Sequence, residues 1–507
     1  MIKNKILNFG ILFSFILIIF FSCRKEDDFN NSSSFQLKFS TDTLVFDTIF
    51  AKVGSATRKI TVLNTSNKAI KINNIKVIGG NNSPYQINVD GRAGNTQNNI
   101  EIDANDSIYI FANVTIDPTE KNNPFVVEDN ISFSVNGNQQ KVVLQAWGLN
   151  ANYIVADDFD RYPTFKLHYK IVAKKGETVI WTNERPYFIY GGFARINGKL
   201  IIEKGTKVYC YAGTGIWSAP DAAIDINGTK EEPVIIQGSR TTGFDKDYAG
   251  QWNRIMINES NQDSHINYAI IKNGVIGIQP ETKRIIKSNK LYISNSIIEN
   301  HSIANIYAVA SRIQGENLVL GNAGQGGVFL RNGGDYSFKQ ITVGNYSKTS
   351  RENPAFYVEN WIKKNNQQIP FDLNLFIGNS IISGKNTGEE YFDTIIPSQT
   401  TTTNIKIQNC LLSTSRKIEN FPDRYINTII NKDPKFYGVE NEIKNNNKEK
   451  ETPMYFELTA GSPAIGIGDP KIASEVPKDI KGNNRALPKP DLGAYQSDFS
   501  PKLSPIR

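Results

Sequence analysis

One short stretch decides the fold of this chain: Ile293-Ser294-Asn295-Ser296-Ile297-Ile298. The same unit, in which Asn and a small residue stand before two apolar residues, returns in Phe376–Ile382 and in Ile405–Leu412, and a weaker copy is Ile266–Ile271. Asn379 and Asn409, the asparagines of the Phe376–Ile382 and Ile405–Leu412 copies, are 30 residues apart. A repeat of about 20–30 residues that carries one such unit predicts a solenoid, in which each coil stacks on the next.

The asparagine of this unit has a physical role at a coil corner. Asn tolerates the left-handed backbone angles of a tight corner better than most residues do, and stacked Asn amides can hydrogen-bond into a ladder. We therefore align Asn267, Asn295, Asn379 and Asn409 as one column of corners.

Segments on both sides of the repeat resemble a known architecture. Three of them resemble the first coils of right-handed parallel β-helix proteins with a pectin-lyase-like fold: Leu200–Val208, Ala223–Thr229 and Pro233–Gly238. Three others resemble the terminal segment of bacterial surface β-helix proteins that are often labelled choice-of-anchor Q: Gly461–Gly466, Asp479–Arg485 and Asp491–Tyr495. The resemblance implies a right-handed parallel β-helix with a C-terminal cap over residues 170–497, followed by a tail at 498–507.

Residues 35–150 follow a different pattern. Short segments such as Lys59–Leu63 and Ile108–Phe111 alternate with a period of two, and turn signals separate them. About seven such strands predict a β-sandwich. Ser40–Leu44 and Ile116–Pro118 resemble the immunoglobulin-like modules that precede larger domains in surface proteins of Bacteroidetes-type bacteria. That resemblance implies a spacer or adhesive unit over 35–150, with a linker and the lead into the β-helix at 151–169.

The N-terminus has the order of a secretion signal. Lys3 and Lys5 precede an uncharged apolar run, Ile6–Phe21, which ends just before Ser22-Cys23. A membrane-spanning helix needs about 20 residues, and this run is shorter. We therefore expect the segment to be cleaved.

Cys23 lies in a sequence that resembles the lipobox of bacterial lipoproteins, Phe20–Cys23, although Phe20 is bulky where Leu or Val is usual. The following Arg24–Asp28 resembles the export tag that sends lipoproteins of Bacteroidetes-type bacteria to the outer face of the outer membrane. The resemblance implies a signal peptide at 1–22, a diacylglycerol on the Cys23 sulfur and a lipidated tether at 23–34, so that the partner is the membrane. The alternative is a plain secretory signal with an incidental cysteine.

Composition bounds the remaining possibilities. A chain of 507 residues suggests two or more domains. The net charge is +7, but Lys and Arg are scattered rather than gathered in a stripe, so no nucleic-acid partner is expected. Beyond Cys23 the chain has only Cys210 and Cys410, without a CxxC or Cys/His cluster, so we expect neither a metal nor another cofactor. The abundance of Asn, Gly, Thr and β-branched residues favours an all-β fold.

The motifs of β-helix enzymes are missing. The pectin-hydrolysing relatives use Gly-His-Gly and Arg-Ile-Lys, and this chain has neither. Its coil-region acids do not repeat at coil spacing, so no general acid and base can be placed. His265 and His301 are expected at coil edges, where a lone histidine is usually solvated, and His168 is expected in a strand. Catalytic residues therefore stay unassigned, and the sequence leans against an enzyme.

Aromatic residues in loops are the better candidates for a ligand site, because sugar binding places aromatic faces against pyranose rings. Trp217 falls in a glycine-rich stretch that predicts a loop, and Tyr211 lies just before it. Trp361 precedes a polar insert, Lys363–Gln368, which also predicts a loop. Trp252 is expected to be a packing residue.

A second motif concerns modification. Four sites resemble the Asp-Thr/Ser-aliphatic acceptor for O-glycosylation in Bacteroidetes-type bacteria, namely Thr43, Thr48, Ser107 and Thr394.

Together these observations predict a cell-surface lipoprotein whose function is binding or adhesion, with a glycan or another surface protein as ligand. The competing class is a carbohydrate-active enzyme, a lyase or glycosidase, on a coil face. Three or more acids with a Lys, Arg or His on adjacent coils would favour the enzyme.

Overall fold

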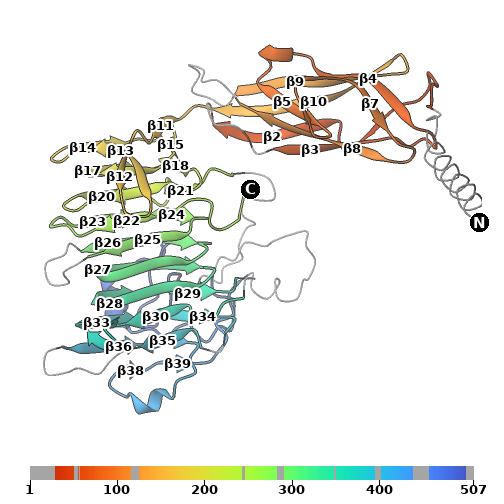
Figure 1. Cartoon of the computed structure of the whole chain (residues 1–507). Helices are drawn as coiled ribbons and strands as arrows, with labels where there is room; N and C mark the ends of the chain where they lie inside the picture. Colours follow the sequence, from red (N-terminus) through yellow and green to blue (C-terminus); the bar gives the residue numbers. More distant parts are fainter. Residues whose placement is uncertain are drawn as a thin grey trace, which may run out of the picture. The chain divides into compact units, whose positions relative to one another are not determined.

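The computed structural model describes residues 29–50, 55, 57–115, 125–241, 246–282, 290–347, 350–386, 388–393, 401–437 and 456–497. The fold is all-β, as the composition predicts. Helical structure among these residues is confined to three short segments: η1 (Gly80–Asn82), η3 (Ile418–Asn420) and α3 (Pro470–Glu475). No described helix has the length and apolar character to cross a membrane. The chain divides into two compact units, Met1–Asn150 and Ala151–Arg507 (Figure 1).

The first unit consists of two five-stranded sheets. One sheet has the order β1 (Lys38–Phe39), β3 (Arg58–Leu63), β8 (Ser107–Val114), β5 (Tyr85–Val89) and β6 (Arg92–Ala93). The other has the order β2 (Thr43–Phe50), β10 (Asn138–Leu149), β9 (Phe125–Val135), β4 (Ile70–Val77) and β7 (Thr96–Ile102). Alternate residues of both sheets, such as Ile60, Tyr85 and Phe133, are buried in one core. This period-two burial is what the alternating sequence predicts.

The second unit winds so that each strand pairs in parallel with a strand one coil further on. Each coil has three strands, so the stack has three faces, which Figure 1 shows as layers of arrows. Two hairpins depart from this pattern: β12 (Asp158–Arg161) runs antiparallel to β13, and β31 (Trp361–Lys364) pairs with β32 (Gln367–Pro370).

We name the faces by their strands. The first face contains β13 (Lys166–Ala173), β16 (Phe193–Ile196), β19 (Gly215–Ser218), β22 (Ile255–Asn258), β25 (Ile276–Glu281), the starts of β27 (Ala304–Gly321) and β28 (Gly326–Lys339), β30 (Phe356–Glu359) and β35 (Glu390–Asp393).

The second face contains β14 (Thr178–Trp181), β17 (Lys199–Glu203), β20 (Ala223–Asn227), β23 (Ser264–Asn267), the start of β26 (Leu291–Glu299), the middle of β27, the end of β28, β33 (Leu373–Gly378), β36 (Thr403–Gln408) and β38 (Tyr425–Ile426).

The third face contains β11 (Asn152–Val155), β15 (Tyr187–Tyr190), β18 (Lys207–Cys210), β21 (Val234–Gly238), β24 (Ala269–Lys272), the ends of β26 and β27, β29 (Thr342–Asn345), β34 (Ile381–Gly384), β37 (Leu411–Leu412) and β39 (Ile429–Ile430).

Inward-pointing side chains stack coil upon coil. On the first face one such column runs through six successive coils, and all of its members are fully buried: Ile216, Ile255, Ile278, Ile306, Val328 and Phe356. Because every coil adds the same kind of side chain at the same place, the repeat builds one continuous apolar interior.

Asparagines do occupy a left-handed corner, as the repeat predicts. Asn295, Asn379 and Asn409 have φ of 49°, 48° and 48°. The amide of Asn295 donates to the Asn267 side chain at 2.9 Å. The alignment of Asn267 was one residue off, however, because Asn267 pairs with Ser294 in the sheet and Tyr268 takes the corner with φ 48°.

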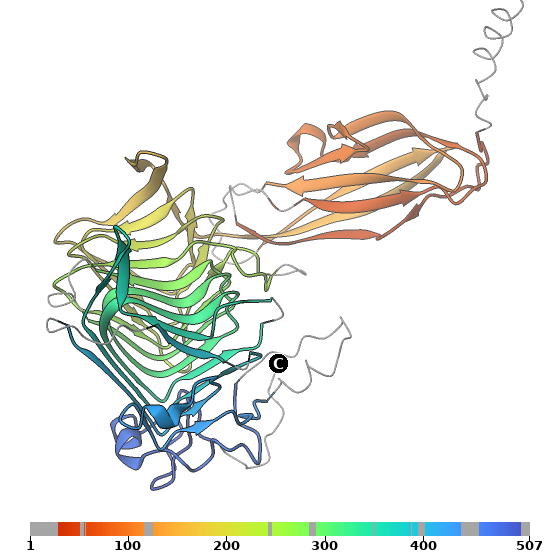
Figure 2. The same ribbon diagram turned by 60° about the horizontal axis from the view of Figure 1, so that its bottom comes forward.

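The later coils of the third face are covered by the chain's own C-terminal segment, 456–497. Its apolar side chains, which include Phe456 and Leu492, pack against outward-pointing residues of that face, among them Val319, Ile381 and Leu411. The backbone N–H of Gly493 donates to the carbonyl of Asn379 at 2.8 Å. Figure 2 shows this blue segment against the last coils.

Candidate functional site

The first face carries an outward column that changes character along the stack. In register from coil to coil the column contains Arg195, Trp217, Met256, Gln279, Tyr307, Phe329, Tyr357 and Tyr391. In the first coils the column lines a hollow, and in the later coils it is a run of aromatic rings in contact.

The hollow has a volume of about 630 Å³, and we call it the Trp217 hollow. Its lining includes two aromatic residues, one guanidinium, four carboxyl groups and two amides: Tyr162 and Trp217, Arg195, Asp160, Asp221, Glu259 and Glu281, and Asn258 and Asn261. Carboxylate and amide oxygens accept hydrogen bonds from hydroxyl groups. This mixture of aromatic and polar groups is typical of small-ligand pockets.

Trp217 lies at the base of this hollow rather than in a loop. The residue belongs to β19, because the turn at Gly213 is already complete and Gly215 pairs with Phe193. Only 7% of Trp217 is exposed, and the Arg195 guanidinium lies 4.6 Å from the centre of its ring. The indole Nε1 is buried without a hydrogen-bond partner. The expectation of a surface loop at Trp217 is therefore wrong.

Arg195 is itself held from two sides. Its guanidinium donates to Asp160 at 2.8 Å and also lies 4.6 Å from the ring of Tyr169. Tyr169 in turn donates from its hydroxyl to Asp160 at 3.2 Å. The β12–β13 hairpin is thus tied to the first face by charge and ring contacts, and its Tyr162 remains 40% exposed at the edge of the hollow.

The other two predicted ligand residues lie elsewhere. Trp361 begins β31, so the predicted loop at 363–368 is a hairpin, and the Trp361 side chain is half-buried. Tyr211 follows β18 and packs against Tyr190, with ring centres 4.9 Å apart. The structure therefore does not bring Trp217, Trp361 and Tyr211 into one site.

The lower part of the first face was missed by the sequence reasoning. Four rings follow one another with centres 5.6, 5.7 and 5.7 Å apart, and we call them the aromatic column: Tyr307, Phe329, Tyr357 and Tyr391. In the sequence, the column is visible only as an aromatic residue at the same place in successive coils. Because the coils differ in length, these residues have no constant spacing.

Charged groups flank the aromatic column. Arg331 binds both carboxyl oxygens of Glu359, at 2.9 and 3.1 Å, and the Tyr357 hydroxyl donates to the same carboxylate at 3.1 Å. Burial, the largest single influence, acts to lower the pKa of Arg331, but the hydrogen bonds and charge interactions with Glu359 and Tyr307 together outweigh it and raise that pKa. Arg331 is therefore a permanent cation at this face.

The histidines do not form a catalytic group. His301 is fully buried, and burial lowers its pKa to about 4, so the expectation of a solvated coil-edge histidine is wrong. His265 is half exposed, with Nδ1 3.0 Å from Asp225 and its ring stacked on Tyr292. His168 is exposed on β13. Within the described residues no three His, Cys, Asp or Glu side chains are placed to hold a metal ion.

The modification sites are only partly visible. Thr43 begins β2 and Ser107 begins β8, and both side chains are half-buried. Cys23, Thr394 and the side chain of Thr48 lie outside the described residues.

Comparison with known proteins gives no family. No family model matches the chain, and no curated protein matches it. Among solved structures, a family 123 glycoside hydrolase from Clostridium perfringens is 9% identical over 24% of this chain and 30% of its own, with a TM-score of 0.18. A PapD-like domain of human CEP192 is 7% identical over 25% of this chain and 92% of its own, with a TM-score of 0.16.

A third similar structure is the Salmonella enterica SafA pilin in complex with the SafB chaperone. It is 11% identical over 25% of this chain and 59% of its own, with a TM-score of 0.17. The match to the first of these structures spans less than a third of the hydrolase. At these scores the similarities carry no argument about function.

Proposed function

We propose that this protein is a surface lipoprotein that binds glycans, without transforming them, on the first face of its second unit. The observation that carries the proposal is the Trp217 hollow, where Tyr162 and Trp217 stand beside carboxylate and amide acceptors. Sugar hydroxyls donate to such acceptors, and the apolar faces of sugar rings pack on aromatic side chains.

The accessible aromatic residue of the hollow is Tyr162. Its ring stacks on Phe165 with centres 4.8 Å apart and planes within 10°, which fixes its orientation before any ligand arrives. Trp217, which is 7% exposed, contributes the floor of the hollow. A preordered aromatic residue lowers the entropic cost of binding.

We also propose the finer architecture and the location. Two five-stranded sheets around one core support an immunoglobulin-like sandwich, and parallel pairing from coil to coil supports a right-handed parallel β-helix. The lipid anchor on Cys23, exposure on the outer membrane and a Bacteroidetes-type origin rest on the N-terminal sequence. A surface protein is the other ligand class that an exposed coil face suits.

A glycan array with the chain from Arg24 onward tests the proposal. We expect Tyr162→Ala to weaken binding to the selected glycan about tenfold, the loss of one aromatic contact. Tyr190→Ala is the matched control, since Tyr190 has nearly the same exposure, 38% against 40%, but lies on the third face. A folded protein that binds no glycan on the array, or equal losses in both variants, would refute the proposal.

A second candidate function is a polysaccharide lyase or glycosidase in the same hollow. The specific observation in its favour is that four carboxyl groups and Arg195 line the hollow from adjacent coils. A uronate-release assay on mixed polysaccharides distinguishes the two functions. Product that disappears with a chelator or in Glu281→Gln would establish the lyase, whereas glycan binding without product supports the binding protein.

A further inference from the structure

A second hollow lies at the other end of the stack and is built by three successive turns of one corner. The turns follow β34, β37 and β39, and they contribute residues 383–386, 413–416 and 431–436. The space measures about 680 Å³. We call it the lysine hollow.

The charge of the lysine hollow is opposite to that of the Trp217 hollow. Its lining contains Lys385, Arg416, Lys432 and Lys435 but only one acid, Asp433. Lys385 donates to the backbone carbonyl of Ser347 at 2.8 Å. Within the described part of the chain neither Lys432 nor Lys435 has an ion pair. The lining therefore carries four cationic side chains against a single carboxylate, Asp433.

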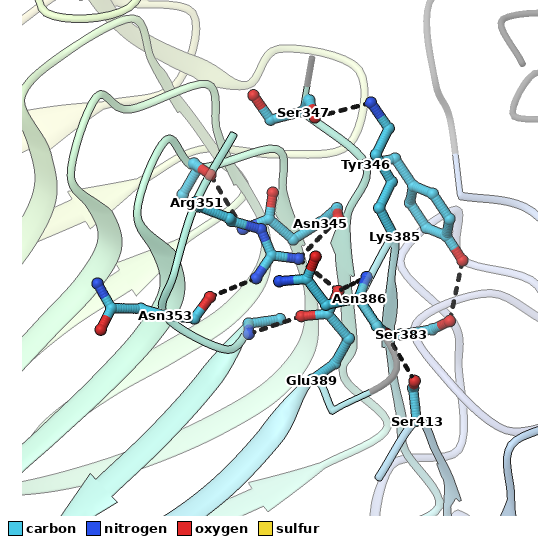
Figure 3. A network of polar contacts seen from close by, with 12 residues as sticks. Asn345, Tyr346, Ser347, Arg351, Asn353, Ser383, Lys385, Asn386, Glu389 and Ser413 are labelled. Atoms are coloured by element: carbon cyan, nitrogen blue, oxygen red, sulfur yellow. Dashed lines mark hydrogen bonds and ion pairs between the residues drawn. The ribbon is translucent and has the colours of Figure 1, made fainter. Parts of the chain in front are cut away.

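A buried polar network lies beside the lysine hollow and holds one of its turns. Arg351 and Glu389 form a buried ion pair, and the Glu389 carboxylate also accepts the backbone N–H of Asn386 at 2.7 Å and that of Ala355 at 2.9 Å (Figure 3). The Ser413 hydroxyl donates to the Asn386 carbonyl at 3.1 Å. These bonds fix the turn that carries Lys385, so this part of the lining does not need to be ordered by a ligand.

Neutral polar groups complete the lining. Hydroxyl groups come from Ser383, Ser413, Thr414 and Ser415, and amides come from Asn386 and Asn431. Tyr346 and Phe436, which are 7% and 2% exposed, close the lining on its apolar side, with ring centres 6.1 Å apart. Hydroxyls and amides suit sugar hydroxyls, and lysines suit the point charge of an oxyanion.

We propose that the lysine hollow is a second binding site, specific for a sugar that carries an oxyanion group such as a sulfate or phosphate ester. The site does not depend on the Trp217 hollow, which lies on the first coils of the stack and whose charged residues are four acids and one arginine. One molecule thus holds two polar sites of opposite charge.

The experiment is isothermal titration of the chain from Arg24 onward with glucose 6-sulfate, glucose 6-phosphate, inorganic sulfate and glucose. We expect the two charged sugars to bind, their affinity to fall as salt rises, and glucose to bind at least about tenfold more weakly. Inorganic sulfate reports the share of the oxyanion alone. The double variant Lys432→Ala/Lys435→Ala should lose about tenfold or more in affinity for the charged sugars.

Two controls make the result specific. Lys175→Ala removes an exposed lysine from the turn between β13 and β14 in the first coils and should leave binding unchanged. Tyr162→Ala should also leave it unchanged, which separates this site from the proposed glycan function. Saturable binding of glucose as strong as that of its esters, no saturable binding of either ester, or an unaltered double variant would overturn the proposal.

Discussion

The first and third faces of the second unit are made by the same coils but end in different surroundings. In the later coils the outward column of the third face is mainly aliphatic and includes Val319, Ile381 and Leu411, and the C-terminal segment covers it there. The outward column of the first face is polar and aromatic, and Tyr391 at its lower end is 46% exposed. Outward aliphatic side chains require a cover, whereas stacked rings with charged neighbours shield one another and tolerate water.

The largest effect should come from opening the covered face. Phe456 is 1% exposed, and its ring lies against Gly321 and Gly344, where a Cβ would come within 2.7 and 2.2 Å of it. We expect Phe456→Ala to lower the free energy of unfolding of the second unit by about 3–5 kcal/mol. Tryptophan fluorescence in guanidinium measures this, since four of the five tryptophans belong to that unit and only Trp147 belongs to the first.

The matched control for this change is Phe421→Ala, because Phe421 is 36% exposed. Its loss should cost less than about 1 kcal/mol. Equal costs at Phe456 and Phe421 would show that the C-terminal segment does not stabilise the third face.

A smaller effect on the free energy of unfolding should come from His301, which is buried in the interior of the second unit. His301 is fully buried with its pKa lowered by burial to about 4, while the unfolded histidine titrates near 6.5. The unfolded state therefore binds the proton first, and stability that is complete above pH 6.5 is lost as pH falls toward 4. The loss should reach about 3 kcal/mol, and unfolding curves at pH 7.5, 5.5 and 4.5 would measure it.

His301→Gln should flatten this pH dependence, whereas His168→Gln should not, because His168 is exposed. If both variants keep the slope of the parent protein, His301 does not cause it.

The smallest effect should come from the aromatic column. Tyr357 lies between Phe329 and Tyr391, with ring centres 5.7 Å from each. Tyr357→Ala should cost about 1–2 kcal/mol, since it removes ring contacts that are only half-buried. Tyr357→Phe, which removes the hydroxyl bond to Glu359 alone, should cost about 1 kcal/mol. A cost for Tyr357→Ala as large as that for Phe456→Ala would show that the aromatic column stabilises the unit as much as the covered third face does.

Local chemistry made part of this fold predictable. The left-handed corners at Asn295, Asn379 and Asn409 could be expected from the backbone tolerance of asparagine. The sandwich strands could be expected because alternate burial leaves a period-two pattern in the sequence. The misalignment of Asn267 also comes from reliance on local pattern. A one-residue slip in the repeat cannot be detected from the sequence until strand pairing fixes the register.

The candidate site depends on information that no local pattern holds. The hollow joins Tyr162 of the first hairpin with Glu281, more than a hundred residues later, and only the number of residues in each coil determines that meeting. Trp217 does line this hollow, but it lies in a strand, because the glycines near it end a turn rather than extend a loop. The turns of the lysine hollow likewise meet only because three coils stop at the same corner.

The stack closes in β38 and β39, which have two residues each. A parallel stack with long final strands would offer a row of unpaired N–H and C=O groups on which another molecule could continue the pattern. Strands this short leave few such groups. A second molecule therefore finds little unpaired backbone at the last coil on which a fibre could grow.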